Sequence, residues 1–415
     1  MPQSHRPAAR DGGPPIGRHQ GDSMQHLDAA DAAPFTPAAA APRVLGIRFT
    51  GSGSEYFRIW AVNLLLILVT LGLYLPFAKA RRIRYFYANT LVDGQALGFH
   101  GDPWKMFRGF VLLILLMGAY SAAGRLSSVA AVVAFLILCV VWPALWRASL
   151  QFRLGNTSWR GLRMRFEGSL TDAYLACAPS YLPAIALVVG ATQMEPEAMK
   201  AGAGLTPSFW LYIVGALCMA LLAPWSLALF KRYQHNGYRI AGQHSHVKLS
   251  GGQLYLLVLK IVLVSLVPLV LAGVLMTASF MMARTLGGSR ETGLVVIVIG
   301  SLLAYLLYFA VVTPYAATRL QNLVWNGTSS ESLSFNSQLK FGAMFWLTLK
   351  NWLLTALTLG LYRPFAAVAT ARLRLEAVSI DCADDPLDWV AAASAGHADA
   401  TGEIAGDFFG IDMGL

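Results

Sequence analysis

The chain has 415 residues, of which 56% are hydrophobic and 13% are charged, and its formal net charge is +10. Soluble domains carry about 25% charged residues, so the composition argues against a water-soluble fold, because too little polar surface is available to cover a globule. The basic residues lie between long apolar runs, which favours a membrane protein over a nucleic-acid-binding protein.

The chain divides into three parts by composition. Residues 1–41 are rich in Ala, Pro, Gly and His and contain no apolar signal-peptide core, so we predict a disordered leader there. A membrane domain built from repeats is expected over residues 42–380. An acidic C-terminal tail is expected over residues 381–415.

The first apolar segment of the membrane domain returns near its end. Asn63 begins NLLLILVTLGLYLPFA and Asn351 begins NWLLTALTLGLYRPFA, so the two copies are 288 residues apart. Asn63 and Asn351 are polar groups in apolar surroundings. Each either forms hydrogen bonds between helices or lines a pathway for a solute.

These two terminal segments are too short for two crossings of about 20 residues each. In one interpretation each enters the membrane and returns as a re-entrant loop, with Gly72 and Gly360 of TLGLY at the reversal. In the other, each is an ordinary single span, which gives eight spans and places both termini outside.

A basic cluster follows the first TLGLY copy directly. It comprises Lys79, Arg81, Arg82 and Arg84, and aromatic residues follow it. It either anchors the topology or binds anionic phospholipid headgroups. The second copy has Ala367, Ala369 and Thr370 in place of the first three cations, so a charge-dependent role belongs to the first copy.

Six stretches between the terminal segments are long and apolar enough to cross a bilayer. The expected transmembrane helices are 107–124, 128–147, 173–193, 209–229, 258–282 and 294–316. Pro183 and Pro268 fall inside two of them and should kink them. Kinked spans and re-entrant loops in related copies favour a transporter, although only weakly.

Weaker repeats lie between the terminal copies. In each, a proline after an apolar run is followed by basic residues and, about a dozen residues later, by an asparagine. The pairs are Pro76 with Asn89, Pro143 with Asn156, Pro224 with Asn236, and Pro314 with Asn326. Short alternating segments follow, and Asp93-Gly94 favours a tight turn in the first. We expect small β-hairpins outside the hydrocarbon, on the basic, cytoplasmic side.

The stretch TLGLYLPFAKARRIRYFYANTLVDG resembles the YjgN-like bacterial inner-membrane family, a domain of unknown function. The resemblance runs from about Arg48 to the end and includes GEIAGDFFGIDMGL. It implies an inner-membrane location. The family offers no established catalytic or binding residues that can be transferred to this chain.

The sequence therefore predicts an all-α polytopic membrane protein with six transmembrane helices, two terminal re-entrant or spanning segments, small cytoplasmic β-hairpins and internal repeats. No phosphate-binding glycine loop, HExxH or GxSxG motif is present, so we expect no enzyme activity and no cofactor. Passage of a small solute or lipid is one expected function. A non-transporting scaffold that binds lipids or envelope proteins is the alternative.

Overall fold

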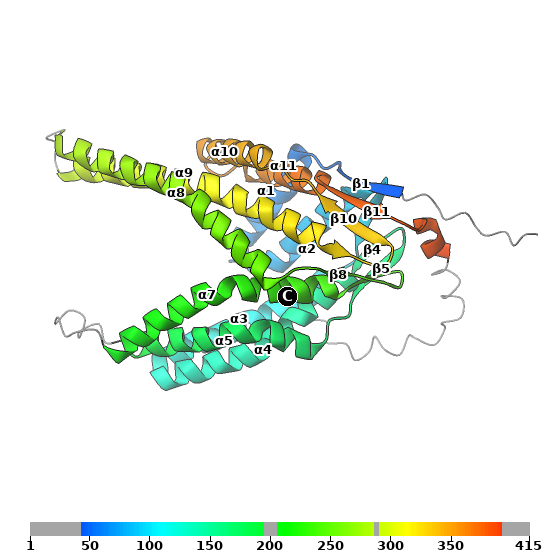
Figure 1. Cartoon of the computed structure of the whole chain (residues 1–415), viewed down its shortest axis with the longest axis horizontal. Coiled ribbons are helices and arrows are strands. Elements are labelled where there is room, and N and C mark those ends of the chain that lie inside the picture. The colour runs from blue at the N-terminus through cyan, green and yellow to red at the C-terminus, as the bar shows by residue number, and fades with distance from the viewer. Residues whose placement is uncertain (1–42, 195–205, 286–289, 392–415) are drawn as a thin grey trace, which may run out of the picture. The chain divides into compact units, whose positions relative to one another are not determined.

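The computed structural model describes residues 43–194, 206–285 and 290–391 (Figure 1). The predicted leader, residues 1–41, lies outside the described residues, as does the expected tail beyond residue 391.

Strands and helices follow one another in a recurring order of strand, helix, helix and strand. The first two sets are β1 Arg43–Phe49, α1 Gly53–Val69, α2 Leu75–Ala88, β2 Thr90–Val92; and β3 Gln95–Phe99, α3 Pro103–Leu126, α4 Ser128–Gly155, β4 Thr157–Trp159. The third is β5 Leu162–Phe166, α5 Leu170–Thr192, α7 Pro207–Asn236, β6 Tyr238–Ile240. The fourth begins with two short strands and is β7 Gln243–His244, β8 His246–Val247, α8 Gly251–Thr285, α9 Arg290–Asn326, β9 Thr328–Ser329. The fifth is β10 Leu333–Ser337, α10 Phe341–Leu357, α11 Arg363–Glu376, β11 Val378–Cys382.

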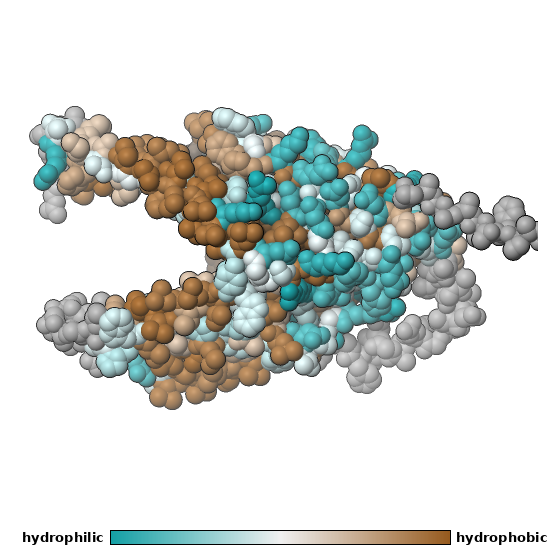
Figure 2. Space-filling view, viewed as in Figure 1, coloured by the Kyte–Doolittle hydropathy of each residue, from teal (hydrophilic) through white to brown (hydrophobic). Residues whose placement is uncertain are grey.

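Six of the described helices are long and apolar enough to cross a membrane, namely α3, α4, α5, α7, α8 and α9. They coincide with the six predicted spans. In the most apolar 18-residue stretch of each helix, only 11% to 22% is buried inside the protein. Most of this apolar surface is therefore left for lipid to cover. Figure 2 shows apolar residues over these helices and hydrophilic residues gathered over the strands.

The strands of the described residues join into one eleven-stranded antiparallel sheet in the order β7-β6-β5-β4-β3-β2-β1-β11-β10-β9-β8. The two ends of this order, β7 and β8, are separated in the chain only by Ser245, so the sheet nearly closes. The prediction of an all-α protein with small hairpins is therefore wrong in this respect. An isolated hairpin is marginally stable in water, and here each hairpin pairs with the next.

The hairpins themselves turn as the sequence predicted at Asp93-Gly94. Asp93 and Gly94 have φ values of 50° and 74°, and Val92 pairs directly with Gln95. Positive φ at both turn residues matches the twist of the flanking strands. Arg160–Gly161 and Ala241–Gly242 adopt the same conformation in the next two hairpins.

The two ends of the membrane domain meet in this sheet. Strand β1 pairs with β2 on one side and with β11 on the other, where Arg43 lies opposite Cys382. Strand β11 continues to Cys382, past the expected start of the tail at residue 381. Trp389 follows it and is buried. The first residues of the expected tail thus belong to the folded unit.

One apolar cluster fills the concave side of the sheet. Its buried members come from five strands, β1, β2, β4, β5 and β11, and from the segment after β11: Leu45, Val92, Trp159, Leu162, Cys382 and Trp389. Residues of β3, β6 and β10 pack against them. Side chains from opposite parts of the sheet therefore meet in its interior.

The helices follow the same circular order as the strands. The second helix of each pair packs against the first helix of the next pair, and α11 packs against α1. A side chain on each second helix also donates a hydrogen bond to the backbone just before the next pair. These bonds run from Arg84 to Gly101 O, from Arg147 to Gly168 O, from Arg232 to Leu249 O, from Asn322 to Leu339 O and from Arg372 to Gly51 O.

Candidate functional site

The two TLGLY segments form the same tight turn. Gly72 lies between α1 and α2 with φ +93°, and Gly360 lies between α10 and α11 with φ +94°. The hydroxyl of Thr70 accepts a hydrogen bond from the Tyr74 amide at 3.0 Å and donates to Leu66 O. Thr358 makes the equivalent bonds. Both glycines thus lie in the turn between two helices.

Asn63 and Asn351 are buried between helices. The Asn351 side-chain amide donates to Thr370 Oγ1 at 3.3 Å and lies 3.5 Å from Ala366 O, both on α11. Among the described residues, the side-chain oxygens of Asn63 and Asn351 have no hydrogen-bond partner. Neither asparagine lines either of the two cavities described below. Their position favours a role in helix packing over one in a pathway.

The basic cluster is divided among three environments. Arg84 donates to Gly101 O at 3.2 Å. Arg81 and Arg82 are exposed and lie over the rings of Tyr74 and Phe86 at 5.5 Å and 5.8 Å. Lys79 is also exposed, and it lines a cavity between helices. The four side chains therefore make different contacts.

The cavity beside Lys79 has a volume of about 380 Å³ and lies between α2, α3 and α4. Its walls are apolar apart from Lys79 and Ser149. The remaining lining residues are Leu75, Pro76, Met106, Phe110, Leu113, Trp142, Leu145 and Trp146. One ammonium group in an apolar cavity is suited to an anion that carries a hydrocarbon chain.

Three further cations on other second helices are linked to Lys79 through successive neighbours. Arg153 on α4 is close enough to Lys79 and to Lys231 of α7 for their positive charges to repel each other. Arg374 on α11 repels Lys231 in the same way. Arg374 Nε donates to Gln321 Oε1 of α9 at 2.7 Å. Among the described residues, none of the four cations forms an ion pair. We call Lys79, Arg153, Lys231 and Arg374 the central cations.

Sequence reasoning missed three of the central cations, although a signal was present. Each second helix contains a proline. Lys79 stands three residues after its proline, Lys231 seven residues after, and Arg153 and Arg374 ten residues after. Offsets of three, seven and ten residues fall on one face of a helix. Only an alignment on these prolines brings the four cations together.

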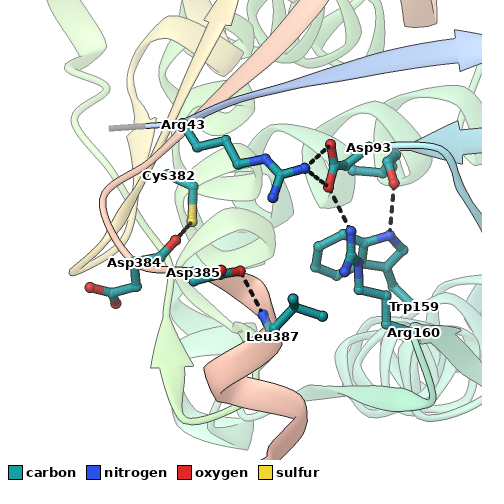
Figure 3. Close-up of polar contacts among 9 residues, drawn as sticks. Arg43, Asp93, Trp159, Arg160, Cys382, Asp384, Asp385 and Leu387 are labelled. Atoms are coloured by element: carbon teal, nitrogen blue, oxygen red, sulfur yellow. Dashed lines mark hydrogen bonds and ion pairs between the residues drawn. The ribbon is translucent and has the colours of Figure 1, made fainter. Parts of the chain in front are cut away.

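A separate polar cluster holds the turns of the sheet (Figure 3). Asp93 forms ion pairs with Arg43 at 3.1 Å and with Arg160 at 2.5 Å, and Trp159 Nε1 donates to Val92 O. Through Asp93, this cluster links the start of β1 to the first two hairpin turns, so we assign the cluster a structural role. Within the described ranges, no group of three or more His, Cys, Asp and Glu residues is placed to hold a metal ion.

Comparisons with known proteins identify the family of this chain. A family model described as "Bacterial protein of unknown function (DUF898)" matches residues 44–408. The chain belongs to this family. It is 25% identical over 334 residues to the inner membrane protein YjgN of Salmonella typhimurium, covering 77% of this chain and 84% of that protein.

Two shorter alignments link the chain to proteins with the same description. It is 30% identical over 130 residues to the inner membrane protein YjgN of Escherichia coli O157:H7, covering 30% of this chain and 32% of that protein. For the protein of Escherichia coli K12 the identity is 31% over 126 residues, with coverage of 29% and 31%. No solved structure matches. With its six apolar helices, the chain is a multi-pass protein of the bacterial inner membrane, as predicted.

Proposed function

We propose that this protein binds an anionic phospholipid in the cavity beside Lys79 and passes its headgroup toward the other central cations. The observation that carries the proposal is an apolar cavity of about 380 Å³ with one ammonium group, itself close to Arg153 of the neighbouring helix. The apolar walls suit acyl chains and Lys79 suits a phosphate. A polar solute would lose its hydration there with few groups to replace it.

The same proposal includes re-entry of both terminal helix pairs. After Arg58, the apolar part of α1 covers residues 59–69, which span about 17 Å at 1.5 Å per residue. The hydrocarbon core is about 30 Å thick. Strands β1 and β2 flank the pair and are neighbours in one sheet. These features support entry and return over a full crossing.

The tips of these pairs support immersion in lipid. Leu71 and Leu359 have positive φ and are 94% and 95% exposed. A left-handed backbone costs a residue other than glycine about 1–2 kcal/mol. An exposed leucine gains nothing from this conformation in water, whereas in lipid its side chain is in a favourable medium.

Repetition of one unit is part of this proposal. In four units the proline stands thirteen residues before the residue that caps the second helix: Pro76 and Asn89, Pro143 and Asn156, Pro224 and Gly237, Pro364 and Ala377. We infer that five related units surround the central cations. The two re-entrant units are adjacent, since α11 packs against α1. There a headgroup would have less hydrocarbon to cross.

The experiment is reconstitution of the full chain in vesicles of phosphatidylcholine containing a fluorescent phosphatidylglycerol. Chemical quenching from outside measures movement of the labelled lipid between leaflets. We expect the protein to accelerate it. Lys79→Ala should slow movement about fivefold, the contribution of one cation near anionic lipid. Arg81→Ala, on the same helix but outside the cavity, is the matched control. Movement no faster than in protein-free vesicles would contradict the proposal.

A non-transporting scaffold is the second candidate. The observation that favours it is the apolar cluster around Trp159 and Trp389, which occupies the interior of the sheet. Neither candidate requires catalysis. Binding of phosphatidylglycerol that depends on Lys79, without movement between leaflets, would favour the scaffold.

A further inference from the structure

A second cavity lies between α8 and α9, where the two helices approach the sheet. Its volume is about 820 Å³, and it shares no lining residue with the cavity beside Lys79. The lining residues are Lys248, Gln253, Leu256, Leu257, Lys260, Tyr315, Arg319, Asn322, Leu323, Asn326, Gly327 and Ser329. No carboxylate is among them.

Three cations line this cavity, and among the described residues none of them has an ion-pair partner. They are Lys248 before α8, Lys260 on α8 and Arg319 on α9. The Arg319 guanidinium lies over the Tyr315 ring at 5.4 Å, which restricts its orientation. Like charges around one cavity repel each other, so an anion between them would be stabilised by all three.

The neutral groups of the cavity also favour an anion. The side-chain oxygen of Asn322 already accepts from the Leu339 amide at 3.0 Å and from Ser337 Oγ. The Asn326 oxygen accepts from the Ser337 amide, and the Gln253 oxygen from the Ser250 amide at 2.8 Å. Each of these carboxamide oxygens thus already accepts at least one hydrogen bond from the protein, which leaves it less able to bind a metal cation. The Gln253 amide nitrogen is left as a donor.

We propose that this cavity is a binding site for a phosphoryl group, with Lys248, Lys260 and Arg319 as its ligands. The shared chemistry is a phosphate with at least one negative charge, carried either by a lipid headgroup or by a free phosphate. Leu256, Leu257 and Leu323 provide apolar contacts beside the cations. The inference does not rest on the proposed function, because different helices and residues form the site.

The test uses the purified full chain in a neutral detergent and measures its unfolding midpoint. One arm adds inorganic phosphate, and the other adds phosphatidylglycerol in mixed micelles, with phosphatidylcholine as reference. The site variant is Lys260→Gln/Arg319→Gln. The matched control is Lys105→Gln/Arg108→Gln, which removes the same charge from the exposed start of α3.

We expect one of the two phosphates to raise the midpoint of the wild type. The site variant should weaken this binding about thirtyfold, the effect of two cations near an anion, and the control should leave it unchanged. Stabilisation by phosphatidylglycerol alone assigns the site to a lipid, and stabilisation by inorganic phosphate assigns it to a free phosphate. Lys79→Ala should retain this binding, which separates the site from the cavity beside Lys79.

Equal effects in the site and control variants would overturn the inference, as would the absence of any phosphate-dependent shift in the wild type. If the double variant does not fold, Lys248→Gln replaces it, since Lys248 precedes the helix. That single change should weaken phosphate binding about fivefold. Unchanged affinity in Lys248→Gln would then overturn the proposal.

Discussion

The helix pairs α1–α2 and α10–α11 share a turn but differ in the charge that follows it. Leu71 and Leu359 have φ values of 49° and 50°, and the glycines after them have 93° and 94°. On the next helix, the first pair has Lys79, Arg81 and Arg82, whereas the second has Ala367, Ala369 and Thr370. The turn therefore forms without the cations. This separates a structural element, present twice, from a set of charges that is present in one pair only.

The same difference changes the surroundings of the two buried asparagines. Asn351 donates to Thr370, and the first pair has Arg82 at the position of Thr370. Arg82 is exposed and lies over the Phe86 ring. In the second pair, a hydrogen bond thus joins the buried asparagine to the neighbouring helix. In the first pair, the residue at the same position, Arg82, points away from the asparagine.

The largest expected effect is a charge at either tip. We predict that Leu71→Asp and Leu359→Asp each destabilise the folded protein by about 3 kcal/mol, because a carboxylate would enter hydrocarbon. The measurement is the amount of folded protein and its unfolding midpoint in membranes. Leu→Asn at the same positions is the control, since Asn accepts positive φ without charge. Tolerance of aspartate at one tip alone would show that the two pairs are not equally immersed.

The next effect concerns the arginines at equivalent positions of the two pairs. Arg372 donates to Gly51 O at 2.8 Å and to Phe49 O at 3.3 Å, whereas Arg84 donates, among the described residues, only to Gly101 O at 3.2 Å. We predict a loss of about 2 kcal/mol for Arg372→Gln and about 1 kcal/mol for Arg84→Gln, measured by unfolding. An equal or larger loss at Arg84 would be inconsistent with a structural role divided in this way.

The turn glycines should respond alike. Gly72→Ala and Gly360→Ala each place a Cβ on a backbone with φ above +90°, so we predict a loss of about 1–1.5 kcal/mol at both positions. Thermal unfolding measures it. Gly118→Ala is the control, because Gly118 lies in a helix with open space around it and alanine should be neutral or stabilising there. Unequal losses would show that the two turns are not equivalent in the folded protein.

The smallest effect is expected at Arg81 and Arg82. Both side chains are exposed, so Arg81→Gln/Arg82→Gln should change the free energy of unfolding by less than about 0.5 kcal/mol. Movement of labelled phosphatidylglycerol should also stay near the wild-type rate. A loss as large as that of Lys79→Ala would mean that the cluster acts as one unit.

The long apolar helices could be predicted from the sequence because hydropathy is a local property. Their ends could not be predicted, since α4 continues past the predicted limit of 147 to Gly155, and Arg153, which lies near Lys79, belongs to this extension. The Asp93-Gly94 turn could also be predicted, because the two residues of the turn themselves determine its conformation. The sheet could not, because Phe99 pairs with Thr157 and Arg43 with Cys382 across long stretches of chain, and no local pattern specifies such partners.

The candidate site was predicted only in part. Lys79 was singled out by its place in a basic run, but the same run suggested that Arg84 shared its role, whereas Arg84 bonds to a backbone carbonyl. Arg153 and Arg374 were inconspicuous because each is one basic residue among several on its helix. Their approach to the centre depends on packing between units.

The proposed topology requires all strands of the sheet to lie on one side of the membrane, with both terminal helix pairs entering and returning. The direct measurement is a reporter fused after Leu415, either a fluorescent protein that matures in the cytoplasm or a phosphatase that is active only in the periplasm. A fusion after Thr285, at the opposite end of α8, provides the periplasmic control. We predict fluorescence and no phosphatase activity at Leu415. Phosphatase activity there would contradict this topology.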